Sequence, residues 1–466
     1  MRSNNSVCTV TLSSNLTFLK FWLSDGARDG FLSNVEKEDL ESLRLVCHDF
    51  STRAARYLFK NIRISFKAGT FTKPARVAAL ERIGHHVQSL SCSISHTAET
   101  FLPPLIDPYT GEERNFIYTP QLNMPSTLIG KVKQPKYGSW EVADLLVKQY
   151  PPLFHAATNV PAFIRAFTAL PNLSHLIVSC PGHDKAQDSR RSIVDYALIS
   201  LRLAIEHAPL HHLDTLSFLP IHAAGLFYMQ PVLGIGASPR SAKRWVQIRR
   251  IAIHMDGLES NFIRRSDYLK ALHTYLRTFS LSLVELRFRW RDAKGPCPLS
   301  LASEPGACFE GAQYSPARND SSPRALYFPQ LRHMQLENAI LDASQISSFI
   351  SQHRRTLTEF NFEDVKLRTG DWDEALSPLS QISGSDKWKK KQEEIMDVPL
   401  MLSHENLGQE IVHNVALEQK PERRSRSWGG WLSKTRSGKA CKAKEQLMGG
   451  SEHMRKLLRS SILTWR

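Results

Sequence analysis

Three apolar residues at positions i, i+3 and i+5 recur along this sequence, and their recurrence constrains the fold more than any other feature. With about a third of its residues apolar, a chain this long contains roughly a dozen such triplets by chance, so the segments preceding each triplet decide its meaning. The eight triplets of interest are Phe59-Ile62-Ile64, Val87-Leu90-Cys92, Leu173-Leu176-Val178, Leu213-Leu216-Phe218, Ile248-Ile251-Ile253, Leu283-Leu286-Phe288, Leu331-Met334-Leu336 and Leu357-Phe360-Phe362.

Five of the triplets directly follow a helix-like segment and a short turn. The clearest segment, 189–207, places four apolar side chains on one face at a spacing of four residues and is followed by Pro209. Segment 161–170 begins with a proline, which suits the first helical turn, and Gly84 follows segment 73–83 as a C-terminal cap. Segments 264–279 and 342–353 complete the set. A repeated order of helix, turn and short strand predicts an α/β solenoid.

The repeats are degenerate in length and in sequence. From Leu176 onward the middle residues lie 26 to 48 residues apart, and only the last interval, from Met334 to Phe360, matches the ~20–29 residues of a leucine-rich unit. The asparagine that often follows the strand is missing, with Pro181 and Val365 at that offset. The predicted fold is therefore α/β, a degenerate leucine-rich-repeat-like solenoid over residues 67–376. Its insertions near 95–137 and 291–325 are rich in proline or glycine and are predicted to be disordered, with functional loops as the alternative.

The positive charge is concentrated at the C-terminal end. Of the net charge of +15, residues 420–466 supply +10, from thirteen Lys and Arg against three Glu. This part is rich in serine and glycine, which predicts a largely disordered basic tail over residues 377–466. Two interpretations stay open, a solvated tail or a nuclear-import or polyanion-contacting patch.

Cysteine and hydropathy patterns indicate a cytoplasmic or nuclear protein without a membrane span. The seven cysteines are scattered, and none forms a CxxC motif, so we expect reduced thiols and no zinc site. No stretch approaches the ~18 uninterrupted apolar residues of a membrane helix. The apolar stretch 7–23 is interrupted by polar residues, including Lys20, and does not predict a secretory signal.

Catalytic motifs are missing from the sequence. There is no HExxH or GxSxG, and GIGASPR at 234–240 lacks the third glycine and the Lys-Ser/Thr of a phosphate-binding loop. The doublets His85-His86 and His211-His212 precede strands and are interpreted as polar turns, and TGDWDEAL as an acidic helix start. The sequence therefore predicts a protein that is not an enzyme, with no catalytic residues, metal or cofactor.

The stretch EDLESLRLVCHDF, followed by an Ala/Arg helix and LFKNIRI, resembles the second half of an F-box as found in fungal F-box and leucine-rich-repeat-like proteins. The resemblance covers about residues 37–66, and the fragments ALPNLSHL, FPQLRHMQLENA and HRRTLTEFNFEDV are similar to that family's repeats. It implies an adaptor whose F-box docks on a Skp1-type subunit of a cullin-RING ubiquitin ligase, while the solenoid binds a protein target.

Position along the predicted helix 39–47 gives the residues for that docking surface. Leu40, Leu43 and Val46 share one face, whereas Leu45 is expected to point partly toward the protein's own core. The candidate contacts with a Skp1-type partner are Leu40, Leu43, Leu45, Val46 and Phe50. Two alternatives remain: an interaction scaffold without Skp1 binding, and a nucleic-acid-associated protein acting through the tail.

The beginning of the F-box departs from the family pattern. The family's Leu-Pro and first helix correspond here to LSDGARDGFLSNVEKED, in which Ser24 replaces the proline. Gly26 and Gly30 each cost ~1 kcal/mol of helix propensity. The sequence therefore predicts an eroded first helix, a poorly defined segment 1–36 and weak Skp1 binding.

Overall fold

The computed structural model describes residues 16–123, 135–182, 191–231, 241–257, 262–299 and 326–381, together with a short strand at 463–464. The chain divides into two units, 1–376 with 461–466, and 377–460. Of the second unit only residues 377–381 are described, in a 3-10 helix, Ser377–Gln381. Most of the predicted basic tail, the GIGASPR segment and most of the insertion 291–325 therefore lie outside the described residues.

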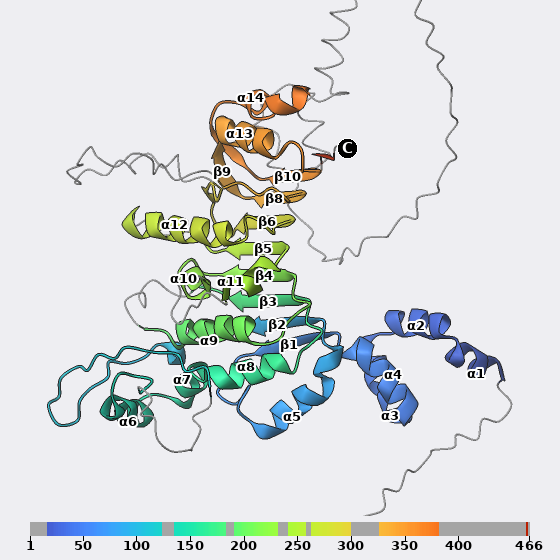
Figure 1. Ribbon diagram of the computed structural model, residues 1–466, viewed down its shortest axis with the longest axis vertical. Helices are drawn as coiled ribbons and strands as arrows, with labels where there is room; N and C mark the ends of the chain where they lie inside the picture. The colour runs from blue at the N-terminus through green and yellow to red at the C-terminus, as the bar shows by residue number, and fades with distance from the viewer. Residues whose placement is uncertain are drawn as a thin grey trace, which may run out of the picture. The chain divides into compact units, whose positions relative to one another are not determined.

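Four short helices, coloured blue in Figure 1, form what we call the N-terminal module. They are α1 (Leu16–Leu23), α2 (Asp25–Asn34), α3 (Lys37–Val46) and α4 (His48–Leu58). The module has its own small core of buried side chains, contributed by Trp22, Leu32, Leu40, Ala54 and Leu58.

The structure forms a regular helix, α2, in the window where the sequence predicted an eroded helix. It spans the window that holds Gly26 and Gly30, and both glycines face open space. Leu32 of the same helix is almost completely buried in the module core. Most of the stability of a short helix in a protein comes from packing of its apolar face, which here offsets the low propensity of the two glycines.

Eight parallel strands form the main sheet, and their order in the sheet follows their order in the chain (Figure 1). They are β1 (Asn61–Ser65), β2 (Ser89–Ser93), β3 (His175–Cys180), β4 (Thr215–Ile221), β5 (Arg250–Met255), β6 (Glu285–Trp290), β8 (His333–Glu337) and β10 (Glu359–Glu363). A two-residue strand, β12 (Leu463–Thr464), pairs antiparallel with β10 at the edge.

The strands predicted from the eight triplets are confirmed, and so is the alignment of their middle residues. Each middle residue pairs in register with the next, so that one row crosses the whole sheet. The row consists of Ile62, Leu90, Leu176, Leu216, Ile251, Leu286, Met334 and Phe360. From β2 onward this row is buried, because alternate side chains of each strand point into the core.

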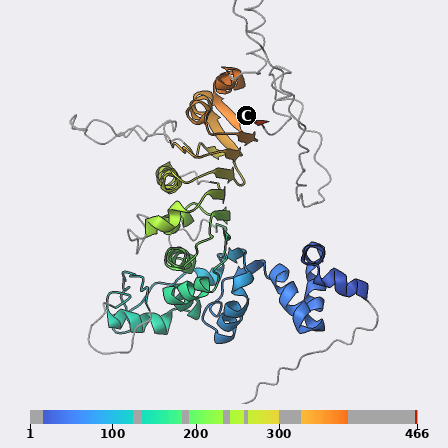
Figure 2. The same cartoon turned by 45° about the vertical axis from the view of Figure 1, so that its right-hand side comes forward.

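Helices cover one face of the sheet, as Figures 1 and 2 show from two directions. The strands alternate accordingly: β6, for example, buries Leu286 and Phe288 and exposes Arg287 and Arg289. The helices between β1 and β10 are α5 (Pro74–Ile83), α6 (Trp140–Gln149), α7 (Pro152–Ala157), α8 (Val160–Thr168), α9 (Ile193–His207), α10 (Gly225–Met229), α11 (Ser241–Val246), α12 (Phe262–Thr278) and α13 (Ala343–His353). Two 3-10 turns, Gly84–His86 and Ala98–Thr100, flank β2.

All five helices predicted before the triplets are present, with ends within a few residues of those expected. Gly84 follows α5 in a right-handed helical conformation. Glycine is needed there because an added Cβ would collide with the carbonyl oxygen of Ala169. Asp342 begins α13 with a capping box. The acidic helix start is confirmed as α14 (Trp372–Ala375), where the side chain of Asp371 accepts a hydrogen bond from the backbone N–H of Glu374.

The predicted leucine-rich-repeat-like solenoid is wrong. The structure is an α/β fold with a large parallel sheet of eight strands, the broad class that also holds the Rossmann-like folds. Its crossovers contain whole helices of up to 17 residues, as in α12, instead of the short returns of a leucine-rich unit. A smaller parallel sheet, in the order β11 (Lys366–Thr369), β9 (Ala339–Asp342), β7 (Gly295–Pro296), lies outside the main one.

The predicted disorder of the insertion near 95–137 is also wrong for residues 95–123 and 135–137. Its aromatic side chains pack against the helices: the rings of Phe116 and Phe154 lie 6.2 Å apart, and those of Tyr118 and Tyr196 lie 5.2 Å apart. Burial of these rings holds a segment that has little regular secondary structure.

Truncation of the buried row should destabilise the protein. Leu216, the second residue of β4, belongs to this row and has no exposed surface. We expect Leu216→Ala to lower the free energy of unfolding by ~2–5 kcal/mol in chemical denaturation, because it leaves a cavity. The matched control is Leu281→Ala, which truncates an exposed leucine and should change it by less than ~0.5 kcal/mol. Equal effects of the two changes would contradict the assigned core.

Candidate functional site

The five predicted Skp1-type contacts do not share one surface of the N-terminal module. Leu40 belongs to the module core with 5% of its surface exposed, and Leu43 and Phe50 pack against that core. Only Leu45 and Val46, at the end of α3, are fully available to a partner, with exposed fractions of 88% and 64%.

The expectation that Leu45 points toward the core is wrong. On a helix of 3.6 residues per turn, residue 45 lies roughly 140° around from residue 40. Since Leu40 faces the module core, Leu45 is on the opposite side. The sequence pattern located the apolar residues of α3 but did not show which side of the helix the other helices cover.

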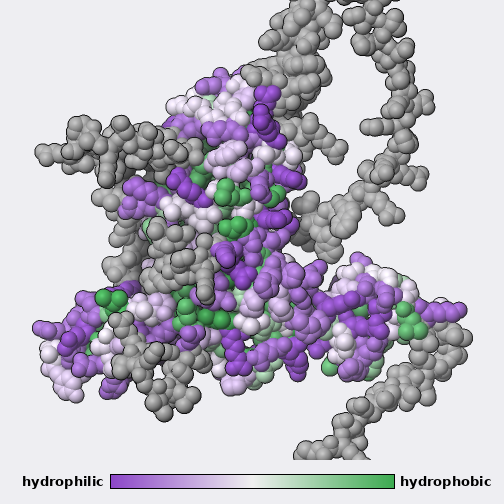
Figure 3. Space-filling model, viewed as in Figure 1, coloured by the Kyte–Doolittle hydropathy of each residue, from purple (hydrophilic) through white to green (hydrophobic). Residues whose placement is uncertain are grey.

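Further exposed apolar side chains lie on the first two helices of the module. Phe18 and Leu23 on α1 and Phe31 on α2 are each more than a third exposed. Figure 3 shows green, apolar areas over these helices among polar surface. Exposed apolar side chains that gather in one patch are common at sites of interaction with other molecules, so these residues are candidates for such a site.

Hydrogen bonds hold α1, the helix that carries Phe18 and Leu23, in place. The indole Nε1 of Trp22 donates to Asp49 at 2.6 Å, and Arg53 donates to the other oxygen of the same carboxylate at 2.7 Å. Burial alone would raise the pKa of Asp49, but these hydrogen bonds outweigh it and lower the pKa. The network joins α1 to α4.

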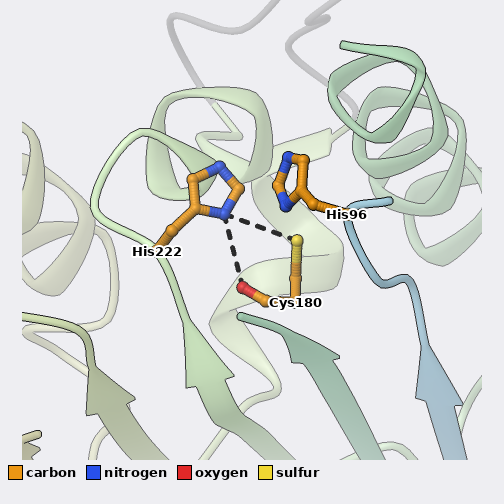
Figure 4. Close-up of side chains that lie close together, drawn as sticks. All are labelled: His96, Cys180 and His222. Carbon is orange, nitrogen blue, oxygen red and sulfur yellow. Dashed lines mark hydrogen bonds between the residues drawn. The ribbon is translucent and has the colours of Figure 1, made fainter. Parts of the chain in front are cut away.

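A second candidate site lies at the carboxyl ends of β2, β3 and β4. His96, Cys180 and His222 follow or end these strands, and their side chains point toward one another (Figure 4). One potential ligand atom from each residue lies within 4.8 Å of the others. We call these three residues the His-Cys-His cluster. Parallel strands bring their carboxyl ends to one edge, so residues that are far apart in sequence meet there.

The contacts within the His-Cys-His cluster are close. Nδ1 of His222 lies 3.5 Å from Sγ of Cys180 and 3.3 Å from the carbonyl oxygen of the same residue. The two imidazole rings are 4.9 Å apart and nearly perpendicular. Nδ1 of His96 lies 2.9 Å from the carbonyl oxygen of Pro181, and its ring stacks on Phe101.

Neighbouring loops hold the backbone around the cluster. The carboxylate of Asp256, which follows β5, accepts a hydrogen bond from the N–H of Gly182 at 2.7 Å and one from Arg291 at 2.8 Å. An added Cβ at Gly182 would lie 3.1 Å from that carboxylate, so glycine permits the close approach. The chain beside Cys180 is thereby tied to the ends of β5 and β6.

Burial sets the protonation states near the cluster. It raises the pKa of the Cys180 thiol well above its usual range, so the metal-free side chain is a neutral thiol and a poor nucleophile. Burial also raises the pKa of Asp195, in the first turn of α9, to about 7, against opposing hydrogen bonds from Tyr228 and the backbone at Ser192. These shifts do not favour a thiolate nucleophile in this cluster.

The sequence prediction of no zinc site overlooked this cluster because it looked for ligands close together in sequence. The usable signal was the position of each residue after a strand triplet. His96 and His222 each stand four residues after the last residue of their triplet, Cys92 and Phe218. In contrast, the doublets His85-His86 and His211-His212 do not belong to the metal-competent group found among the described residues.

Comparison of the sequence with models of known protein families and with curated proteins finds no match. Within the described residues, no helix has both the length and the apolar character needed to cross a membrane. Function must therefore be argued from the two sites themselves.

The raised pKa of Asp195 predicts a pH dependence of stability. The carboxyl has a reference pKa of 3.8 and a folded pKa of about 7, so the folded state binds more protons between these values. Its contribution to stability is therefore lost as pH rises through this window. Relative to Asp195→Asn, we expect the wild-type free energy of unfolding to fall by roughly 2–3 kcal/mol between pH 5 and pH 8, at about 1.4 kcal/mol for each pH unit up to the folded pKa.

Denaturant titrations at several pH values measure this difference. The control is Asp144→Asn, which changes an exposed carboxylate on α6. A difference between wild type and Asp195→Asn that is the same at every pH would contradict the assignment.

Proposed function

We propose that this protein is a substrate-recognition adaptor of a Skp1-cullin-F-box type ubiquitin ligase. The N-terminal module would dock on a Skp1-type subunit, and the α/β part would bind the protein to be ubiquitinated. The observation that carries the proposal is the exposure of Leu45 and Val46 within the segment that resembles an F-box.

The core of the N-terminal module does not use Leu45 or Val46. The module core is filled by other side chains, and Leu40, Leu43 and Phe50 are satisfied within it. Leu45 and Val46 are adjacent, apolar and at the end of a helix, where a partner helix can cover both. Burying one such side chain contributes about 1.5–3 kcal/mol, which is sizeable for a small docking surface.

A separate apolar surface on the α/β part suits the target. Trp140 and Val147 lie two turns apart on α6, which places them on the same face, and about 70% of the Trp140 surface is exposed. The loop carrying exposed Tyr109 is held beside α6, since Gln149 accepts a hydrogen bond from the N–H of Ile106 at 3.0 Å. The enrichment of Trp and Tyr at protein interfaces supports this assignment.

Charges at the docking surface should remove Skp1 binding. We expect Leu45→Asp combined with Val46→Asp to weaken co-purification with a Skp1-type subunit at least ~100-fold, because unpaired charges would be buried. The melting temperature should not change, since both side chains are exposed in the free protein.

The control for this experiment is Leu281→Asp, a charge at an exposed leucine outside the N-terminal module. It should retain the Skp1-type subunit. Wild-type protein that never retrieves such a subunit would contradict the adaptor function and favour the alternative of a scaffold without Skp1 binding.

The reciprocal change tests the target surface. We expect Trp140→Ser combined with Val147→Ser to lose the other co-purifying proteins, identified by mass spectrometry, while keeping the Skp1-type subunit. The Leu45→Asp, Val46→Asp variant should show the opposite pattern. If both variants lost the same proteins, the two surfaces would not have separate partners.

A further inference from the structure

We propose that the His-Cys-His cluster is a zinc site, with Cys180, His96 and His222 as its three protein ligands. This inference is independent of the adaptor function, because the cluster lies at the carboxyl ends of β2, β3 and β4 and not in the N-terminal module.

The donor set selects the metal. One thiol and two imidazoles are the ligands that Zn²⁺ takes in proteins, whereas Ca²⁺ and Mg²⁺ require oxygen ligands. Copper accepts the same donors and is the main competitor for such a site. Zinc is the better fit to a buried thiol and two histidines with one further position open to water.

The spacing of the donor atoms also fits. With Zn–S near 2.3 Å and Zn–N near 2.0–2.1 Å, tetrahedral geometry separates sulfur and nitrogen by about 3.5 Å. The distance from Sγ of Cys180 to Nδ1 of His222 is 3.5 Å. All donor atoms already lie within 4.8 Å of one another, so side-chain movements of at most about 1.5 Å bring each pair to the roughly 3.3–3.5 Å of tetrahedral ligands.

Nδ1 of His222 is held directly against Cys180. Nδ1 of His222 faces both Sγ and the carbonyl oxygen of Cys180, and the 3.3 Å separation from the oxygen exceeds the usual length of an N–H···O bond. The separation of 3.5 Å from Sγ is that of a thiol–imidazole hydrogen bond in the metal-free protein, and it also matches the separation of two ligands on one zinc ion.

The surroundings preorganise the ligands. The carbonyl oxygen of Pro181 lies 2.9 Å from Nδ1 of His96 and restricts the orientation of that ring. Asp256 fixes the adjacent backbone through Gly182. Metal-binding histidines and loops are held by such secondary contacts, which set the orientation of the ligands.

Among the described residues three donors converge, which leaves the fourth position of a tetrahedral site to water. Cys180 and His222 are buried, while His96 is only partly buried. Water can therefore reach the site from the side of His96 and supply the fourth ligand. A site of this kind would join the ends of three neighbouring strands.

The test uses the full chain, reduced and freed of metal with a chelator, and titrated with Zn²⁺ and separately with Co²⁺. We expect one equivalent of each metal to bind, a cobalt–thiolate charge-transfer band with Co²⁺, and a melting temperature that rises with free zinc. The same titration with Cu⁺ measures the preference between the two metals, and a copper affinity without any zinc binding would overturn the proposal.

Two variants and a matched control assign the ligands. Cys180→Ala should abolish the charge-transfer band. His96→Ala should weaken zinc binding at least tenfold, and it perturbs folding less because His96 is only partly buried. Cys92→Ala removes another fully buried thiol, on β2, and should keep the full spectrum. Absence of zinc binding by the wild type, or binding unchanged in both ligand variants, would overturn the proposal.

The outcomes separate this proposal from the adaptor function. Loss of Skp1 binding in a protein that still takes up zinc would count against the adaptor alone. Absence of zinc in a protein that retains Skp1 binding would count against the zinc site alone.

Discussion

Parallel pairing of the eight apolar triplets in one register is the constraint on which the rest of the α/β part depends. The middle residues of the strands form a continuous row, and each addition of a strand extends both the backbone ladder and the buried row. A shift by one residue would move the row to the opposite face, where residues such as Arg287 and Arg289 meet solvent. The register is therefore set by the pattern of side chains.

Parallel pairing also decides where chemistry can occur. Because every strand runs in the same direction, residues far apart in sequence reach the same edge of the sheet. His96 and His222 are 126 residues apart in sequence, yet their rings are 4.9 Å apart. The described strands follow chain order without reversal, so this edge has no crevice of the kind found where strand order reverses. A compact side-chain cluster suits such an edge better than an extended ligand.

The strands and the long helices of the α/β part were predictable from sequence because they depend on local periodicity. Ile193 and Leu201 are buried on α9 as expected, although the helix is buried on every side from Ala197 to Ile205, and each triplet marks a strand. Fold class was not predictable in the same way, since a repeated helix and strand fits several parallel architectures. Aromatic packing of Phe116 and Tyr118, which orders the proline-rich insertion, depends on helices distant in sequence.

The same distinction holds for the candidate sites. The apolar content of α3 was evident, but the side of the helix facing solvent depends on where α1, α2 and α4 pack. Trp22 shows this dependence directly: its indole bonds to Asp49 and its ring packs on Phe50 at 4.2 Å, which draws Phe50 into the module. Once these residues close the core around Leu40, no part of the chain that the structure describes covers Leu45 and Val46 at the end of α3. The module thus completes its own core and still presents Leu45 and Val46 to solvent, an arrangement that internal packing does not require and that a docking partner would use.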